Sequence, residues 1–98
     1  MAFKLIWSPK AQIDFRDLLY YISESNHQAA VNFGSEVIKV IEKLAEFPES
    51  GKMVPEFYNS AIREIICKPY RIIYRVRRNE GLIEITRIWH AARGIPDI

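Results

Sequence analysis

The sequence REIICKPYRIIYRV, residues 63–76, decides the fold, because it consists of two short β-strand patterns separated by Lys68-Pro69. The second pattern alternates, and one set of its side chains would point to one face of a sheet: Tyr70, Ile72, Tyr74 and Val76. The other set would point to the opposite face: Arg71, Ile73, Arg75 and Arg77. A strand of this kind is half-buried and displays positive charge.

The spacing of apolar residues outside this stretch predicts the other elements. We expect strands over residues 3–7, 61–67, 70–77 and 82–90, and helices over residues 9–23 and 27–46. The order is β-α-α-β-β-β, an α+β fold. The last three strands form an antiparallel meander, the first strand joins their sheet, and the two helices form a hairpin on one face. The other face is expected to be open, with Arg71, Arg75 and Arg77 on it.

Local signals support these bounds. Ser8-Pro9 is a strong helix start, and either Asn26 or a Ser25–Gln28 capping box would begin the second helix. Gly34 in the second helix indicates a close approach between the helices. Residues 48–60 are predicted to form a loop that packs down on the fold. The faces of the last strand are ambiguous, because apolar residues occur in both alternating sets.

Length and composition are those of one globular domain over residues 1–98. The chain is 49% hydrophobic and 27% charged, and it contains no apolar run of 18 or more residues. We see no signal peptide and expect a cytoplasmic protein without a membrane partner. Cys67 is the only cysteine, so an internal disulfide is excluded. We interpret Cys67 as a small buried hydrophobe, with a reactive thiol as the alternative.

Charge is distributed unevenly along the chain. Residues 1–60 carry six Lys and Arg against eight Asp and Glu, a net charge of −2, whereas residues 61–98 carry eight against four, a net charge of +4. Seven of the eight cations in the second part are arginines, which grip planar anions better than lysines do. The second part therefore suits an anionic or acidic partner, with a solvated basic face as the alternative.

Chemical motifs are sparse. The only histidines are His27 and His90, no His/Cys cluster has metal-ligand spacing, and no glycine-rich phosphate loop is present. We therefore expect neither a metal nor a cofactor. The remaining arginines, aromatic residues and late histidine suit a phosphate backbone, and they suit an acidic protein equally well.

The order of the segments FPESGKMVPEF, IREI, PYRIIYRV and EITRIWHAAR resembles the RelE/ParE superfamily of toxins from bacterial type II toxin–antitoxin modules. The resemblance covers essentially the whole chain. It implies a compact toxin neutralised by a cognate antitoxin, in a complex that forms a heterotetramer or a larger assembly. RelE-like members cut mRNA in the ribosomal A site, whereas ParE-like members inhibit DNA gyrase.

The resemblance also implies site residues. In RelE-like nucleases, a strand arginine at the position of Arg71 contacts phosphate, and a second arginine at the position of Arg93 stabilises developing charge. A tyrosine about six residues after that arginine is missing here, and so is a lysine cluster in residues 48–60. His90 is either a general acid or base, or a structural or partner-binding residue. Arg71 either makes strand salt bridges or antitoxin contacts, or it holds phosphate.

Our leading hypothesis is a ParE-like toxin that binds DNA gyrase and is not an enzyme. The alternative is a metal-independent, ribosome-dependent mRNA endonuclease that uses Arg71, Arg93 and His90. A third hypothesis is a degenerate member that binds only its antitoxin. We predict an ion pair between Arg63 and Glu64. The expected antitoxin- or target-binding residues are Arg63, Lys68, Arg71, Arg75, Arg77, Arg87 and Arg93.

Overall fold

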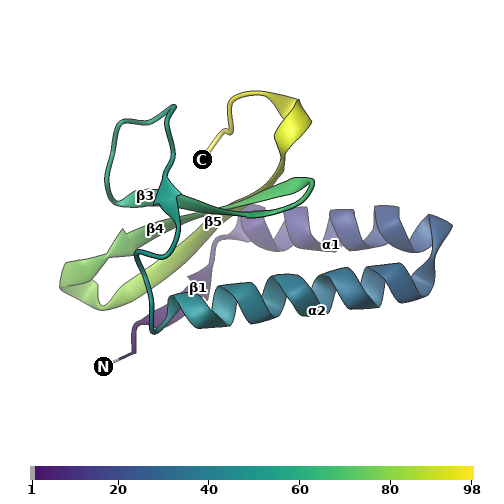
Figure 1. The fold of residues 1–98 in the computed structure, drawn as a ribbon, viewed down its shortest axis with the longest axis horizontal. Helices are drawn as coiled ribbons and strands as arrows, with labels where there is room; N and C mark the ends of the chain where they lie inside the picture. Colours follow the sequence, from purple (N-terminus) through teal and green to yellow (C-terminus); the bar gives the residue numbers. More distant parts are fainter. Residues whose placement is uncertain (1) are drawn as a thin grey trace.

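A computed structural model describes residues 2–98 and confirms the α+β fold (Figure 1). The helices are α1 (Pro9–Ser25) and α2 (His27–Leu44). The strands are β1 (Lys4–Trp7), β2 (Lys52–Met53), β3 (Ile62–Cys67), β4 (Tyr70–Arg77) and β5 (Leu82–His90). They form one sheet in the order β1-β5-β4-β3-β2, in which β1 runs parallel to β5 and the other neighbours are antiparallel. No helix in residues 2–98 is long and apolar enough to cross a membrane.

The helix hairpin begins at the predicted caps. The Ser8 side chain accepts a hydrogen bond from the backbone N–H of Ala11 at 3.0 Å, and the Asn26 side chain accepts one from the N–H of Ala29 at 3.0 Å. Asn26, and not a capping box at Ser25, therefore starts α2. A Cβ atom added at Gly34 would lie 3.2 Å from Leu19 Cδ2, which confirms the close approach of α1 and α2.

The loop before β3 contains a short strand that the sequence did not reveal. In β2, Lys52 and Met53 pair with Glu64 and Arg63 of β3. The start of this segment is tied to the sheet by the hydroxyl of Tyr74. The Tyr74 hydroxyl accepts a hydrogen bond from the N–H of Gly51 and donates one to the carbonyl of Pro48, both at 2.9 Å. Two residues are too few to show a strand pattern in the sequence.

A register shift in β5 explains the ambiguous faces of that strand. Ile73 pairs with Arg87, but the next residue, Tyr74, pairs with Ile85, so Thr86 is an extra residue on β5. The alternation therefore changes phase at Thr86. Three isoleucines of β5 lie in the core under the helices, two from before the extra residue and one from after it: Ile83, Ile85 and Ile88. Trp89 lies on the other side of the sheet.

The sheet has a core on each face. The larger core lies between the sheet and the helix hairpin and includes Leu44, Ile72 and Tyr74. The smaller core, on the opposite face, consists of Val54, Ile62, Ile73 and Trp89, with Phe57 packed against it.

The prediction of an open second face is wrong over this smaller core. The loop before β3 covers it, and the C-terminal segment lies on the same side of the sheet (Figure 1). The physical reason is that Ile62 and Ile73 are too apolar to remain in water.

Candidate functional site

Arg71 is held by carboxylates of the chain itself. Its Nη1 and Nη2 atoms donate to the two carboxylate oxygens of Glu56 at 3.0 and 2.9 Å, and its Nε donates to Glu64 at 2.5 Å. The Arg71 side chain is 11% exposed and that of Glu64 is 3% exposed. Hydrogen bonding from Arg71 lowers the pKa of Glu56, and bonding to Glu56 raises the pKa of Arg71. Because these bonds use Nε, Nη1 and Nη2, the Arg71 guanidinium has no free pair of adjacent donors for a phosphate group.

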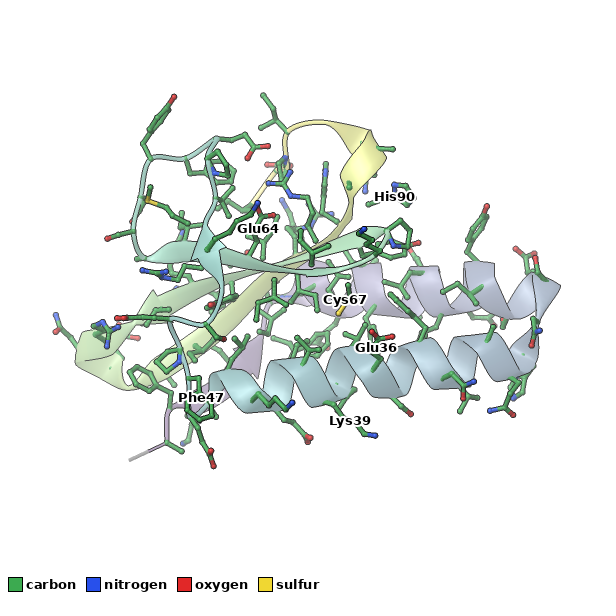
Figure 2. The ribbon with its side chains drawn as sticks, viewed as in Figure 1. Glu36, Lys39, Phe47, Glu64, Cys67 and His90 are labelled. Carbon is green, nitrogen blue, oxygen red and sulfur yellow. The ribbon has the colours of Figure 1, made fainter. Side chains whose placement is uncertain are left out.

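Glu64 pairs with Arg71 and Lys52 rather than with Arg63. Glu64 lies over the sheet on the side away from the helices (Figure 2), and the Lys52 ammonium is 3.9 Å from it. The predicted Arg63–Glu64 ion pair is absent, because neighbouring strand residues point to opposite faces. Arg63 instead donates to the carbonyl oxygen of Gly51 at 2.9 Å.

Two further arginines of the predicted binding surface are paired within the chain. Arg77 donates to Glu84 at 2.9 Å and lies 3.6 Å from Glu80. Arg87 binds both carboxylate oxygens of Asp14 in α1, at 2.7 and 2.8 Å. This pairing with Asp14 raises the pKa of Arg87. With Arg78, which pairs with Glu49, four of the eight cations in residues 61–98 are therefore engaged in ion pairs within the described chain.

The remaining cations are less constrained. Lys68 is exposed and Arg75 is half-buried, and neither forms an ion pair within residues 2–98. The Arg93 guanidinium stacks over the ring of Trp89, 3.9 Å from its centroid. Among the seven cations predicted to bind a partner, those whose side chains make no hydrogen bond or ion pair within residues 2–98 are thus Lys68, Arg75 and Arg93.

His90 and Arg71 lie on opposite faces of the sheet. In the pairing of β4 with β5, Tyr70 is opposite His90, and Arg71 is opposite Trp89. The rings of Tyr70 and His90 meet edge to face with centroids 5.2 Å apart, and Nδ1 of His90 accepts a hydrogen bond from the N–H of Ala92 at 3.1 Å. His90 lies at the end of β5 (Figure 2). The three candidate catalytic residues are therefore not gathered in one site.

His90 and Arg93 do line a common cleft of about 230 Å³. Its aromatic walls come from Tyr21 of α1 and Tyr70 of β4, and Asp14 and Asp17 lie in it too. A histidine, an arginine and two tyrosines can hold an anion and move a proton. The carboxylates in the same cleft oppose a polyanion.

An apolar groove on the outside of the helix hairpin was not found from the sequence. It has a volume of about 480 Å³ between α1 and α2, and a hollow of about 360 Å³ adjoins it through shared residues near Tyr20. Its apolar lining consists of Phe15, Leu19, Ala30, Val31, Gly34 and Ile38. Val31 and Ile38 are 48% and 37% exposed. The sequence did contain one indication of the groove, since Val31 and Ile38 are apolar residues that lie off the buried stripe of α2.

Cys67 is a buried hydrophobe. Its side chain lies between the sheet and α2 (Figure 2), the residue is 4% exposed, and burial raises the pKa of its thiol. A thiol with a raised pKa is a poor nucleophile at neutral pH. Residues 2–98 contain no group of three or more His, Cys, Asp or Glu side chains placed to hold a metal ion.

Comparisons with known proteins agree on one kind of protein. A family described as the ParE toxin of the type II toxin–antitoxin system parDE matches residues 5–95. Toxin RelE2 of Caulobacter vibrioides is 32% identical over 91 residues, covering 92% of this chain and 97% of the relative. Toxin RelE1 of the same organism is 30% identical over 94 residues, covering 92% and 95%.

Solved structures share the fold. The chromosomal ParDE toxin–antitoxin system of P. aeruginosa contains a chain with a TM-score of 0.72 at 20% identity, covering 91% of this chain and 96% of that one. The toxin–antitoxin complex RelBE2 of Mycobacterium tuberculosis gives 0.67 at 17% identity, covering 92% and 99%. A free mutant of E. coli toxin RelE gives 0.69 at 15% identity, covering 96% and 88%.

Proposed function

The chain belongs to the ParE toxin family of type II toxin–antitoxin systems, within the RelE/ParE superfamily, and on that premise we propose that it inhibits DNA gyrase by binding and is not a nuclease. The observation that carries this proposal is that Arg71 is already bound by two carboxylates of the chain. In RelE-like nucleases an arginine at this position contacts the scissile phosphate, but here Glu56 and Glu64 occupy the donors of Arg71. His90, the candidate proton-transfer group, lies across the sheet from it.

Two assays test the gyrase proposal against its alternative. Purified toxin should inhibit the supercoiling reaction of DNA gyrase, and it should leave mRNA intact on translating ribosomes when cuts are mapped by primer extension. A-site cuts that disappear in His90→Ala would overturn the proposal. Inhibition of supercoiling that persists in His90→Ala is the expected result.

A ribosome-dependent endonuclease remains the second candidate. Two relatives carry the name RelE, and the cleft shared by His90 and Arg93 supports it. In that case His90 would transfer a proton and Arg93 would stabilise charge on the phosphate, without a contribution from Arg71. Arg93→Gln would then abolish cutting, whereas Arg71→Gln would leave some cutting in place.

The cognate antitoxin is proposed to dock on the helix hairpin. The groove between α1 and α2 is apolar and exposed, and an amphipathic helix fits such a surface through residues spaced three and four apart. This differs from the sequence-based expectation of an antitoxin over the basic surface, most of which is paired internally. Titration calorimetry with the neighbouring antitoxin should show at least tenfold weaker binding, about 1.4 kcal/mol, for Val31→Glu.

A matched control is available in α1. Ile13 is 48% exposed, the same as Val31, but it does not line the groove. Ile13→Glu should therefore leave the affinity for the antitoxin within about twofold of the wild type, a change below about 0.5 kcal/mol. Equal losses in the two variants would argue against docking in the groove.

A further inference from the structure

Tyr58 is displayed at the tip of the loop before β3 in a conformation that tyrosine seldom adopts. The residue is 90% exposed, the highest value among the large hydrophobic residues of the described chain. Its φ angle is +48°, and it is the only residue other than glycine with positive φ in residues 2–98. A bulky residue in this region of backbone space costs free energy, and such strain persists only where the surroundings impose it.

The surroundings of Tyr58 do impose it. On the N-terminal side, Val54 is fully buried and Glu56 makes its two hydrogen bonds to Arg71. Phe57 packs against the smaller core. On the C-terminal side, the side chain of Asn59 accepts a hydrogen bond from the N–H of Ala61 at 2.9 Å. The loop is therefore anchored on both sides of Tyr58, although the residue itself is exposed to solvent.

We propose that residues 53–58 form a protein-binding surface with Tyr58 as its anchor and Arg71 as a positioning residue, and that its occupant is the protein target of the toxin. This inference rests on the proposed binding function. A residue whose backbone is already fixed loses little backbone entropy on binding, and tyrosine is enriched among residues that dominate interfaces. Met53, 44% exposed, supplies further apolar area in the same segment.

The charge of the loop favours a protein over a nucleic acid. Residues 48–60 contain two carboxylates, Glu49 and Glu56, and one cation, Lys52. The Lys52 ammonium already lies 3.9 Å from Glu64. The loop therefore offers no net positive charge to a phosphate backbone, whose binding depends on neutralising cations.

The surface is separate from the groove proposed for the antitoxin. The loop before β3 and the helix hairpin lie on opposite sides of the sheet (Figure 1). A substitution at Tyr58 should therefore affect the target and spare the antitoxin. This separation makes the inference testable with two binding partners.

The test compares Tyr58→Ala with Phe47→Ala in three assays: inhibition of gyrase supercoiling, growth arrest on induction, and antitoxin affinity by calorimetry. Phe47 is 60% exposed at the end of α2, away from Glu64 and the face that the loop covers (Figure 2). Tyr58→Ala should require at least tenfold more toxin for half-inhibition and should relieve growth arrest. Its antitoxin affinity, and all three readouts of Phe47→Ala, should stay within twofold of wild type.

Two further variants separate binding from folding and from positioning. Tyr58→Gly removes the backbone strain, so it should lose inhibition while its melting temperature is unchanged or higher. Glu56→Gln should weaken inhibition by severalfold, because it weakens the contact with Arg71 that holds the loop in place. In the Tyr58→Ala background, the same change should have no further effect. Independent, additive effects of the two changes would overturn the positioning role of the Glu56–Arg71 contact.

The outcomes are distinguishable. Full inhibition and arrest by Tyr58→Ala would overturn the inference. An equal loss of antitoxin binding, or a loss of binding to a labelled single-stranded RNA, would assign the surface to another partner and overturn it too. Relief of growth arrest by Tyr58→Ala, with a wild type that does not inhibit gyrase, would support the surface and reject gyrase as the target.

Discussion

The two faces of the sheet are closed by different physical means. Under the helix hairpin, the buried core is apolar, and residues such as Leu44 and Ile72 are fully buried, while the ion pair of Asp14 in α1 with Arg87 in β5 adds a polar contact. On the opposite face, the smaller core has only four buried residues, of which Val54 comes from the covering loop, and an ionic group of Arg71, Glu56 and Glu64 also joins the loop to the sheet. An apolar contact carries no titrating group, whereas the ionic group depends on the charge of each member and is weakened by screening salt. We therefore expect the apolar core to contribute most of the stability and the ionic group to respond to pH.

The largest effect should come from the apolar face. Leu44 is fully buried in α2, so Leu44→Ala should reduce the free energy of unfolding by about 4 kcal/mol through lost burial and the cavity left behind. Urea denaturation followed by circular dichroism measures this change. A loss below about 1 kcal/mol would mean that the hairpin is not the main source of stability.

An intermediate effect is expected from the ionic face. Arg71→Met removes the cation between two carboxylates and leaves Glu64, 3% exposed, without its closest partner. We expect a loss of about 2 kcal/mol, less than for a fully buried pair because Lys52 remains near Glu64 and Glu56 reaches water. The same urea titration applies. The control is Arg16→Met, whose exposed pair with Asp17 should contribute less than about 0.5 kcal/mol.

The smallest effect is a pH dependence. The pKa of Glu56 is lowered in the fold by Arg71, so its contribution is present above its ordinary value of 4.5 and is lost as the pH falls through the lower, folded value. At pH 7, Glu56→Gln should cost about 1 kcal/mol. The stability difference between wild type and Glu56→Gln should shrink as urea titrations are repeated at pH values below 4.5. A difference that is constant down to pH 3 would show that the charge of Glu56 is irrelevant.

Much of the fold could be predicted from local sequence. The caps at Ser8 and Asn26, the close approach at Gly34 and the alternation of residues 70–77 depend on residues that are near in the chain, and the structure confirms them. Strand β2 could not be predicted, because two residues carry no period. The extra residue at Thr86 could not be placed either, since it is defined only by its pairing with β4.

The site was harder to predict than the fold. Alternation placed Arg71 on the face away from the helices, but it could not show that Glu56, fifteen residues earlier in a loop, would fold over and bind it. It also could not show that the phase change at Thr86 places His90 opposite Tyr70 rather than beside Arg71. Charge was counted correctly from the sequence, whereas its neutralisation depends on contacts between distant segments.

Ser8 joins the start of the chain to its last strand. Its N–H donates to the carbonyl of Ile85, and its hydroxyl donates to the carbonyl of Thr86 at 2.8 Å, a contact between residues 78 positions apart. Strand β1 pairs with β5 and with no other strand in the sheet. On the ribosome, the first strand must therefore wait until residues 82–90 have emerged from the exit tunnel, since non-local pairing forms only after the intervening chain exists. The sheet therefore lacks its parallel edge strand for most of translation.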